Sequence, residues 1–190
     1  MKDLETADKY MTWATQNDQL QNVKKVIWRN LAKVRLALRK YDRALVASNN
    51  FLKDEDQPYR RADGMLDKAS ILLGLGKYAD ARKTAEDALA LGVEGPLMAS
   101  LKIVLGDISY AEKKFDEAAK HYGVTAELFV NDAELKPKAL FKAAEALDKA
   151  GRKSGPPAKG IPGLETGWRV FASGRTINVL RIETGNGEQA

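Results

Sequence analysis

The sequence lacks cysteine altogether and contains a single histidine, His121. Without cysteine there is no disulfide, no thiolate metal site and no cysteine nucleophile. A single histidine excludes a zinc site built on a histidine pair and disfavours histidine-based catalysis. No apolar run approaches the ~20 residues that a membrane-spanning helix needs, and residues 1–21 have no apolar core of the signal-peptide type. We therefore expect a cytoplasmic protein with no transmembrane segment in this chain, or a periplasmic or membrane-tethered one if a leader has been removed.

The acidic and glycine-containing motifs also fail to form a catalytic or cofactor site. The acidic residues at 54–56 lack the alternating ligands and the glycine of a calcium loop, so they are interpreted as a solvated loop between helices. Gly74 and Gly76 do not follow a strand and do not match a dinucleotide fingerprint, so Gly76 is expected to cap the end of a helix. His121 is interpreted as facing solvent. We predict no catalytic residue, no metal site and no cofactor, and therefore a protein that is not an enzyme.

Charge is abundant and unevenly placed. The net charge of +5 over 190 residues belongs to residues 1–61, which hold 13 Lys or Arg against 8 Asp or Glu. The excess is densest between Lys24 and Arg43, where eight basic residues accompany one acidic residue. This stretch has three interpretations: a solvated helix face, a site for an acidic protein segment, or a nucleic-acid patch. Nucleic acid is the least favoured, because Trp28 and Tyr41 are assigned to the core and leave no aromatic platform for bases.

A repeat with a period of 37 residues organises the middle of the chain. Each unit has a first helix with apolar residues at helical spacing, a short polar break, and a second helix opened by an aromatic residue with alanine three residues on. Small side chains at these places let two antiparallel helices approach closely, and stacked hairpins bury a continuous core. The repeated positions are Ala32, Ala69, Gly106 and Ala144 in the first helices, and Tyr41, Tyr78, Phe115, Ala44, Ala81 and Ala118 in the second helices.

The units resemble the tetratricopeptide repeat family over residues 25–152. The residues that carry the resemblance are Trp28, Leu31, Ala32, Tyr41 and Ala44, then Ala69, Gly76, Tyr78, Ala81 and Ala88, then Leu105, Gly106, Phe115, Ala118 and Tyr122, and finally Ala143, Ala144, Leu147 and Gly151. The period is longer than the usual 34 residues, so longer loops between units are expected. The resemblance implies an all-α fold, a right-handed superhelix of antiparallel helix pairs, followed by a non-helical C-terminal tail.

The chain is expected to have three parts. Residues 1–22 hold a capping helix at 3–16, whose inward face carries Leu4, Ala7, Tyr10, Met11 and Ala14. Residues 23–154 hold the repeats, at about 25–61, 62–98, 99–135 and a partial 136–154, and the first repeat begins with a helix at 19–39. Residues 155–190 form a tail rich in glycine and proline. Two strand-like runs, at 168–172 and 176–182, leave open whether this tail is a short hairpin or disordered.

The resemblance further implies a groove lined by the first helices of the units. The expected groove is basic in the first unit, apolar in the middle and acidic toward the fourth. Its residues are Arg29, Lys33, Leu66, Ser70, Leu73, Ile103, Asp107, Tyr110, Phe141 and Glu145.

We therefore expect a scaffold or adaptor that binds a protein or peptide segment with apolar anchors and an acidic end. Two alternatives stay open. One is self-association into a homo-oligomer through the open end of the fourth unit, because a solenoid end without its last helix exposes apolar surface. The other is weak nucleic-acid binding through the basic first repeat.

Overall fold

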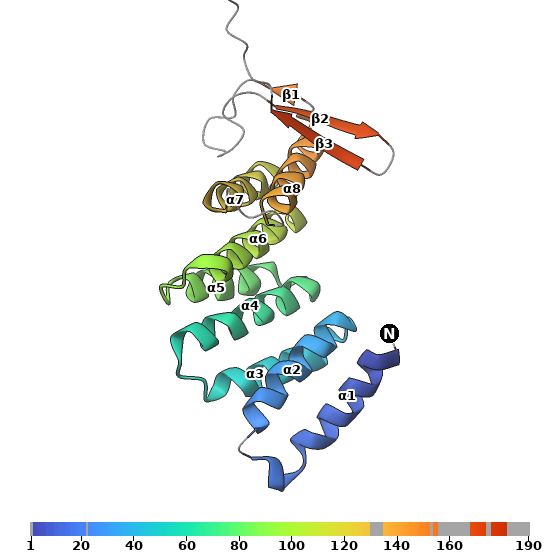
Figure 1. The fold of residues 1–190 in the computed structure, drawn as a ribbon, viewed down its shortest axis with the longest axis vertical. Helices are drawn as coiled ribbons and strands as arrows, with labels where there is room; N and C mark the ends of the chain where they lie inside the picture. The colour runs from blue at the N-terminus through green and yellow to red at the C-terminus, as the bar shows by residue number, and fades with distance from the viewer. Residues whose placement is uncertain are drawn as a thin grey trace, which may run out of the picture. The chain divides into compact units, whose positions relative to one another are not determined.

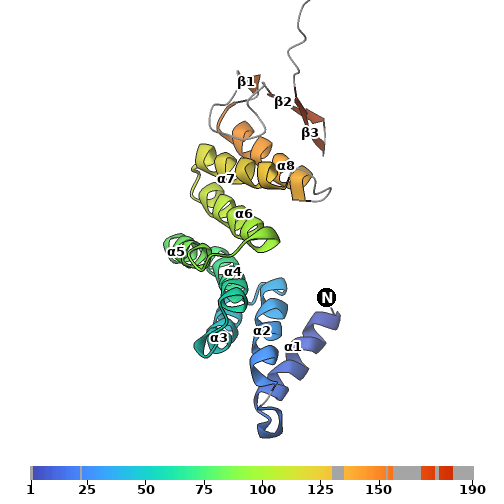
Figure 2. The same ribbon diagram turned by 60° about the vertical axis from the view of Figure 1, so that its left-hand side comes forward.

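The computed structural model describes residues 2–21, 23–129, 135–152, 154–155, 168–173 and 176–181. Within them the chain forms eight α-helices, one 3₁₀ turn and three short strands (Figures 1 and 2). The elements are α1 (Lys2–Thr15), η1 (Asp18–Leu20), α2 (Lys24–Ala37), α3 (Tyr41–Lys53), α4 (Pro58–Gly74), α5 (Tyr78–Leu89), α6 (Gly95–Ala111), α7 (Phe115–Leu128), α8 (Leu135–Lys149), β1 (Ser154–Gly155), β2 (Trp168–Ser173) and β3 (Thr176–Arg181).

The chain divides into two compact units, Met1–Val104 and Leu105–Ala190, and α6 runs through the boundary. Consecutive helices pack in pairs: α2 on α3 and α4 on α5 in the first unit, and α7 on α8 in the second. The all-α repeat fold expected from the sequence is confirmed. None of the helices in the described residues is long and apolar enough to cross a membrane.

The predicted small residues lie where helices touch. Ala44, Ala81 and Ala118 are completely buried, and the aromatic residue three positions earlier is the first residue of α3, α5 or α7 in each case. A Cβ atom placed on Gly106 would come within 2.4 Å of the Tyr122 ring. Glycine is required there because the ring occupies the space that any side chain would need.

Four turns in the chain share one backbone geometry. A left-handed residue follows the end of α2, α4, α6 and α8, at Arg39 (φ 57°), Gly76 (φ 72°), Lys113 (φ 63°) and Gly151 (φ 79°). The next N–H group then donates to a carbonyl five residues back, at 2.8–2.9 Å in all four turns. This is the Schellman arrangement that closes a helix. The expected cap at Gly76 is confirmed, and the turn recurs after α8 in the fourth unit.

The start of the chain corrects two expectations. The helix expected at 19–39 begins at Lys24, because the separate turn η1 precedes it and is capped by the side chain of Asn17. The expected inward face of α1 is also wrong at Tyr10, whose side chain is 65% exposed. Asp8 is buried in its place, since Arg35 lies beneath α1 and its Nε donates to Asp8 Oδ1 at 2.8 Å. Met11 still packs against the core around Leu31.

The strands lie after the last helix. β1, β2 and β3 form an antiparallel sheet in that order, with Val170 opposite Val179 in the β2–β3 pair. The turn expected at Gly174 and the end of the second run at Ile182 lie outside the described residues. β3 packs against α8, so part of the fourth unit's surface is covered by a strand instead of a second helix.

Candidate functional site

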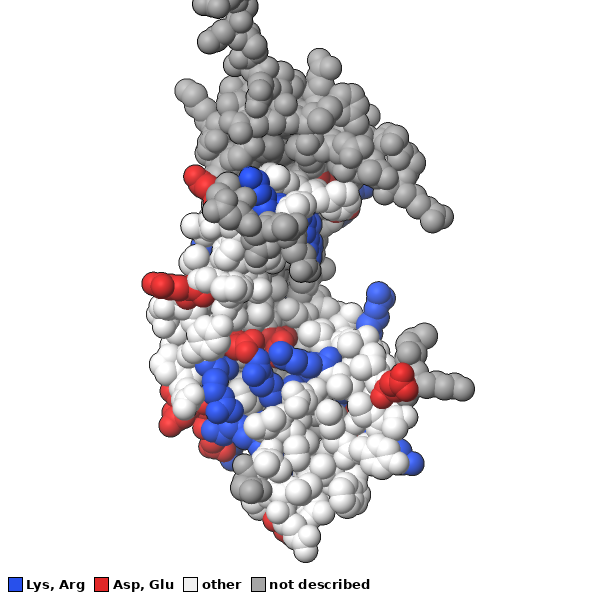
Figure 3. Space-filling model, viewed as in Figure 1, with Lys and Arg blue, Asp and Glu red and all other residues white. Residues whose placement is uncertain are grey.

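The basic residues expected to line the groove in the first unit are paired with carboxylates of the next first helix. The Arg29 guanidinium forms a short ion pair with Asp63 and lies 5.8 Å from the Phe51 ring centroid, while Lys33 Nζ lies 3.7 Å from Asp67 Oδ2. Both pairs join α2 to α4, and Figure 3 shows cationic and anionic side chains side by side over this part of the first unit. The expectation of a basic end therefore needs correction: these cations are largely neutralised within the chain.

Asp67 is the most perturbed carboxyl group in this cluster. Its pKa is raised to about 6, chiefly by burial; the charge of Asp63 also raises this pKa, while Lys33 and Arg29 lower it. Its side chain is only 15% exposed and its buried Oδ2 accepts no hydrogen bond. An ionised carboxylate that is desolvated and underbonded destabilises the fold. The cluster thus holds α2 beside α4 at an electrostatic cost.

Three more cations of the Lys24–Arg43 stretch, Lys25, Arg35 and Lys40, are also engaged. Glu55, expected in a solvated loop, is in fact 2% exposed, and its carboxylate lies 3.8 Å from Lys25 and 3.3 Å from Arg60. Arg35 and Lys40 both bind Asp8, at 2.8 and 2.9 Å. Five of the eight basic residues in the stretch are therefore in ion pairs.

Asp8 fastens α1 to the first repeat. Burial alone would raise the pKa of this carboxyl, but hydrogen bonds from Lys40 and Arg35, together with their charges, hold the pKa below its usual range. Thr12 also accepts a hydrogen bond from Arg35 Nη2, at 2.8 Å. Lys40 Nζ also lies 2.6 Å from Glu5 Oε2, so the two cations of the network are matched by two carboxylates and the network is a structural anchor.

The apolar part of the expected site is divided between surface and core. Leu66, Ser70 and Leu73 are partly exposed on α4. Ile103 is only 9% exposed and belongs to the core, which corrects its assignment as an accessible anchor. Val26, one helical turn before Arg29 on α2, is 49% exposed and adds an apolar surface beside the ion pairs.

In the second unit, Asp107 holds a cation. Its Oδ1 accepts hydrogen bonds from the Tyr122 hydroxyl at 2.6 Å and from Lys142 Nζ at 2.5 Å, and Lys142 Nζ lies 5.5 Å from the Tyr122 ring centroid. Burial, followed by the charge of Asp107, raises the pKa of Tyr122 well above its usual range. Tyr122 therefore remains a hydrogen-bond donor at any ordinary pH.

A second contact between α6 and α8 lies at Tyr110. Its hydroxyl donates to Glu145 Oε1 at 3.4 Å, and its ring meets Phe115 edge-on at 5.3 Å. Burial raises the pKa of Tyr110, and so do the charges of Glu145 and Asp148. Phe141, expected in the groove, is 40% exposed on α8. The structure therefore brings Asp107, Tyr110 and Glu145 together within the second unit.

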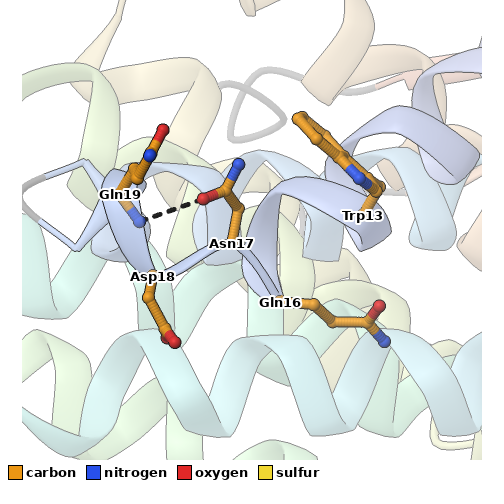
Figure 4. A pocket seen from close by; sticks show the side chains of 5 residues that line it. All are labelled: Trp13, Gln16, Asn17, Asp18 and Gln19. Atoms are coloured by element: carbon orange, nitrogen blue, oxygen red, sulfur yellow. Dashed lines mark hydrogen bonds between the residues drawn. The ribbon is translucent and has the colours of Figure 1, made fainter.

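No motif in the sequence indicated a pocket beside Trp13. It is lined by Trp13, Gln16, Asn17, Asp18 and Gln19, at the end of α1 (Figure 4). Asn17 Oδ1 accepts the Gln19 N–H at 3.0 Å, and the Trp13 side chain is 60% exposed. Within the described ranges, no group of three His, Cys, Asp or Glu residues is placed to bind a metal ion.

Comparison with known proteins agrees with the helix pairs and their repeated turns. Residues 66–129 match the family model described as tetratricopeptide repeat, a segment that begins in α4 and ends just after α7. No curated protein matches the chain. Tetratricopeptide repeats generally serve as non-catalytic scaffolds for protein–protein interaction. This match and the recurring helix pairs support tetratricopeptide repeats in the part of the chain that residues 66–129 span.

Proposed function

We propose that this protein is a scaffold that binds a peptide segment of a partner on the face formed by the first helices of its repeats. The observation that carries the proposal is the pairing of first helices. Arg29 and Lys33 of α2 meet Asp63 and Asp67 of α4. A binding segment laid across these helices would meet one continuous surface in the first unit, since α2 and α4 are in direct contact.

The chemistry of this face favours apolar anchors over an acidic end. Val26 is 49% exposed, and Leu66 and Leu73 are partly exposed on the neighbouring helix. The two cations that a carboxylate would seek are already paired. An acidic segment would have to displace Asp63 or Asp67, whereas an apolar side chain gains contact area without breaking a bond. We therefore propose that apolar side chains of the partner segment make the main contacts with this face, and an acidic end is the alternative.

Two valines provide a matched test. Val26 on α2 and Val46 on α3 are 49% and 56% exposed, but only Val26 lies on the proposed face. Peptides selected from a random display library against the full chain are labelled, and their affinities are measured by fluorescence anisotropy. Val26→Glu should weaken binding by at least tenfold and Val46→Glu by less than twofold, with unchanged circular dichroism. Equal effects of the two substitutions would mean that the first helices are not the binding face.

Self-association is a second candidate function, favoured by a different observation. Tyr10 and Trp13 stand one turn apart on α1 and are 65% and 60% exposed. Paired exposed aromatic side chains are enriched at protein interfaces. Sedimentation of the full chain across a wide concentration range should reveal a dimer that Trp13→Glu abolishes. A monomer at every concentration would eliminate this candidate.

A further inference from the structure

One lysine of the second unit shows how this fold binds an ammonium group. Lys142 of α8 places its Nζ against the Asp107 carboxylate, 2.5 Å from Oδ1, and over the Tyr122 ring at 5.5 Å from the centroid. The carboxylate supplies the opposite charge, and the face of the aromatic ring attracts the cation through the ring quadrupole. The partners come from the neighbouring helices α6 and α7.

The same two kinds of group meet again three residues further along both α6 and α8. Tyr110 donates to Glu145 Oε1 at 3.4 Å, which leaves Glu145 Oε2 unused by that bond. Asp148 follows Glu145 by three positions and Phe141 precedes it by four, so all three lie on one face of α8. Both carboxylates act on the pKa of Tyr110, which places Asp148 close to this cluster.

Among the residues that the structure describes, none places a cation in this second arrangement. Neither Glu145 nor Asp148 forms an ion pair with any described residue, and Lys136, Lys138 and Lys149 of the same helix do not pair with them. Phe141 is 40% exposed, so an apolar surface stands open beside the two carboxylates. The cluster therefore offers carboxylates and aromatic rings, the same kinds of group that hold Lys142, but no ammonium group.

We propose that Glu145, Asp148, Tyr110 and Phe141 form the binding site for a lysine or arginine side chain of the partner segment. This proposal rests on the proposed function and names the chemistry of the partner at the second unit. It reverses the charge expected from the sequence, because the cations at Arg29 and Lys33 are paired within the chain while these carboxylates are not. A basic residue flanked by apolar ones is the segment that fits.

The direct test uses small probes on the full chain labelled with ¹⁵N. N-acetyl-lysine amide and N-acetyl-arginine amide are titrated at low ionic strength, with N-acetyl-glutamate amide as the opposite charge, and amide shifts are followed by NMR. The cationic probes should shift the amides of Tyr110, Glu145 and Asp148 in a saturable way. The double substitution Glu145→Gln with Asp148→Asn should weaken this binding by about tenfold or more. Glu127→Gln, an exposed carboxylate of α7, should leave it unchanged.

A second readout comes from the peptide selection. Peptides selected by the wild-type chain should be enriched in Lys and Arg, and selection by the double variant should lose that enrichment. If peptides bind through Val26 but show no basic preference, and the cationic probes shift nothing, the cation site is refuted while the proposed function stands. If no peptide binds at all, both are refuted. Preference for the glutamate probe would overturn the proposal in favour of an acidic segment.

Discussion

Replacing Asp67 by asparagine should stabilise this protein at neutral pH. Burial holds the pKa of Asp67 at about 6, against an ordinary value of 3.8. Each unit of pKa difference corresponds to ~1.4 kcal/mol between the two protonation states, so ionised Asp67 costs the fold about 3 kcal/mol at pH 7. Asparagine mimics the neutral carboxyl and removes that cost. Lys33 loses a partner 3.7 Å away, but its side chain is 46% exposed, so this loss is worth under ~1 kcal/mol.

The pH dependence makes the prediction specific. Because the folded-state pKa is raised, the folded protein retains a proton on Asp67 that the unfolded chain releases between pH 4 and 6. This contribution to stability is fully present below pH 4 and is lost as the pH rises through 6. The free energy of unfolding is measured by urea denaturation from pH 4 to pH 8 for the wild type and Asp67→Asn. The variant should be about 2–3 kcal/mol more stable at pH 7, and the difference should close toward pH 4.

Asp63→Asn is the matched control for this experiment. It removes a carboxylate of the same helix, one turn away, but leaves the Arg29 guanidinium without its ion-pair partner. It should therefore destabilise the protein modestly, the opposite sign from Asp67→Asn. If Asp67→Asn has a lower free energy of unfolding than the wild type at pH 7, or if the difference between them does not vary with pH, the reasoning that burial of Asp67 outweighs its ion pair is refuted.

Three further predictions test the fold. Lys113→Gly should raise stability by up to ~1 kcal/mol, since glycine adopts the left-handed φ of 63° without strain, while Gly76→Ala in the equivalent turn should lower it; urea denaturation measures both. Gly106→Ala should destabilise by about 1–3 kcal/mol, although alanine usually favours a helix, because the new Cβ meets the Tyr122 ring; an unchanged or raised melting temperature would contradict this. Asp8→Asn should cost about 3–5 kcal/mol by leaving buried Arg35 without its anion, and the same substitution at exposed Asp116 should cost under ~1 kcal/mol.

The parts of this structure that the sequence predicted are the local ones. Helices begin at Tyr41, Tyr78 and Phe115 because a small set of neighbouring residues determines each turn. Three copies of the same pattern locate these helix starts better than one copy would. Buried alanines at a fixed distance from each aromatic follow from the same short-range geometry.

The contacts between repeats could not be predicted from the period alone. Equivalent positions are 37 residues apart, which makes Leu66 the counterpart of Arg29, yet Arg29 binds Asp63, 34 residues away. Neighbouring first helices are thus staggered by almost one turn, and the stagger decides which charges meet. The burial of Asp8 could not be predicted for a related reason. A carboxylate on the buried side of α1 is stable only because Arg35, which is distant in sequence, lies beneath it.

This stagger also explains why net charge is a poor guide to the partner. Contacts between neighbouring first helices join residues that are 34 or 35 positions apart: Arg29 with Asp63, Lys33 with Asp67, and Asp107 with Lys142. Three of the charges expected to line a groove are therefore matched by charges of the adjacent first helix. The fourth contact of this kind joins Tyr110 to Glu145, and a phenol cannot neutralise a carboxylate at ordinary pH. A repeat surface that pairs its charges internally offers a partner only the remainder. In this chain that remainder includes Glu145 and Asp148 of α8, two carboxylates unpaired within the described residues, although the chain as a whole carries +5.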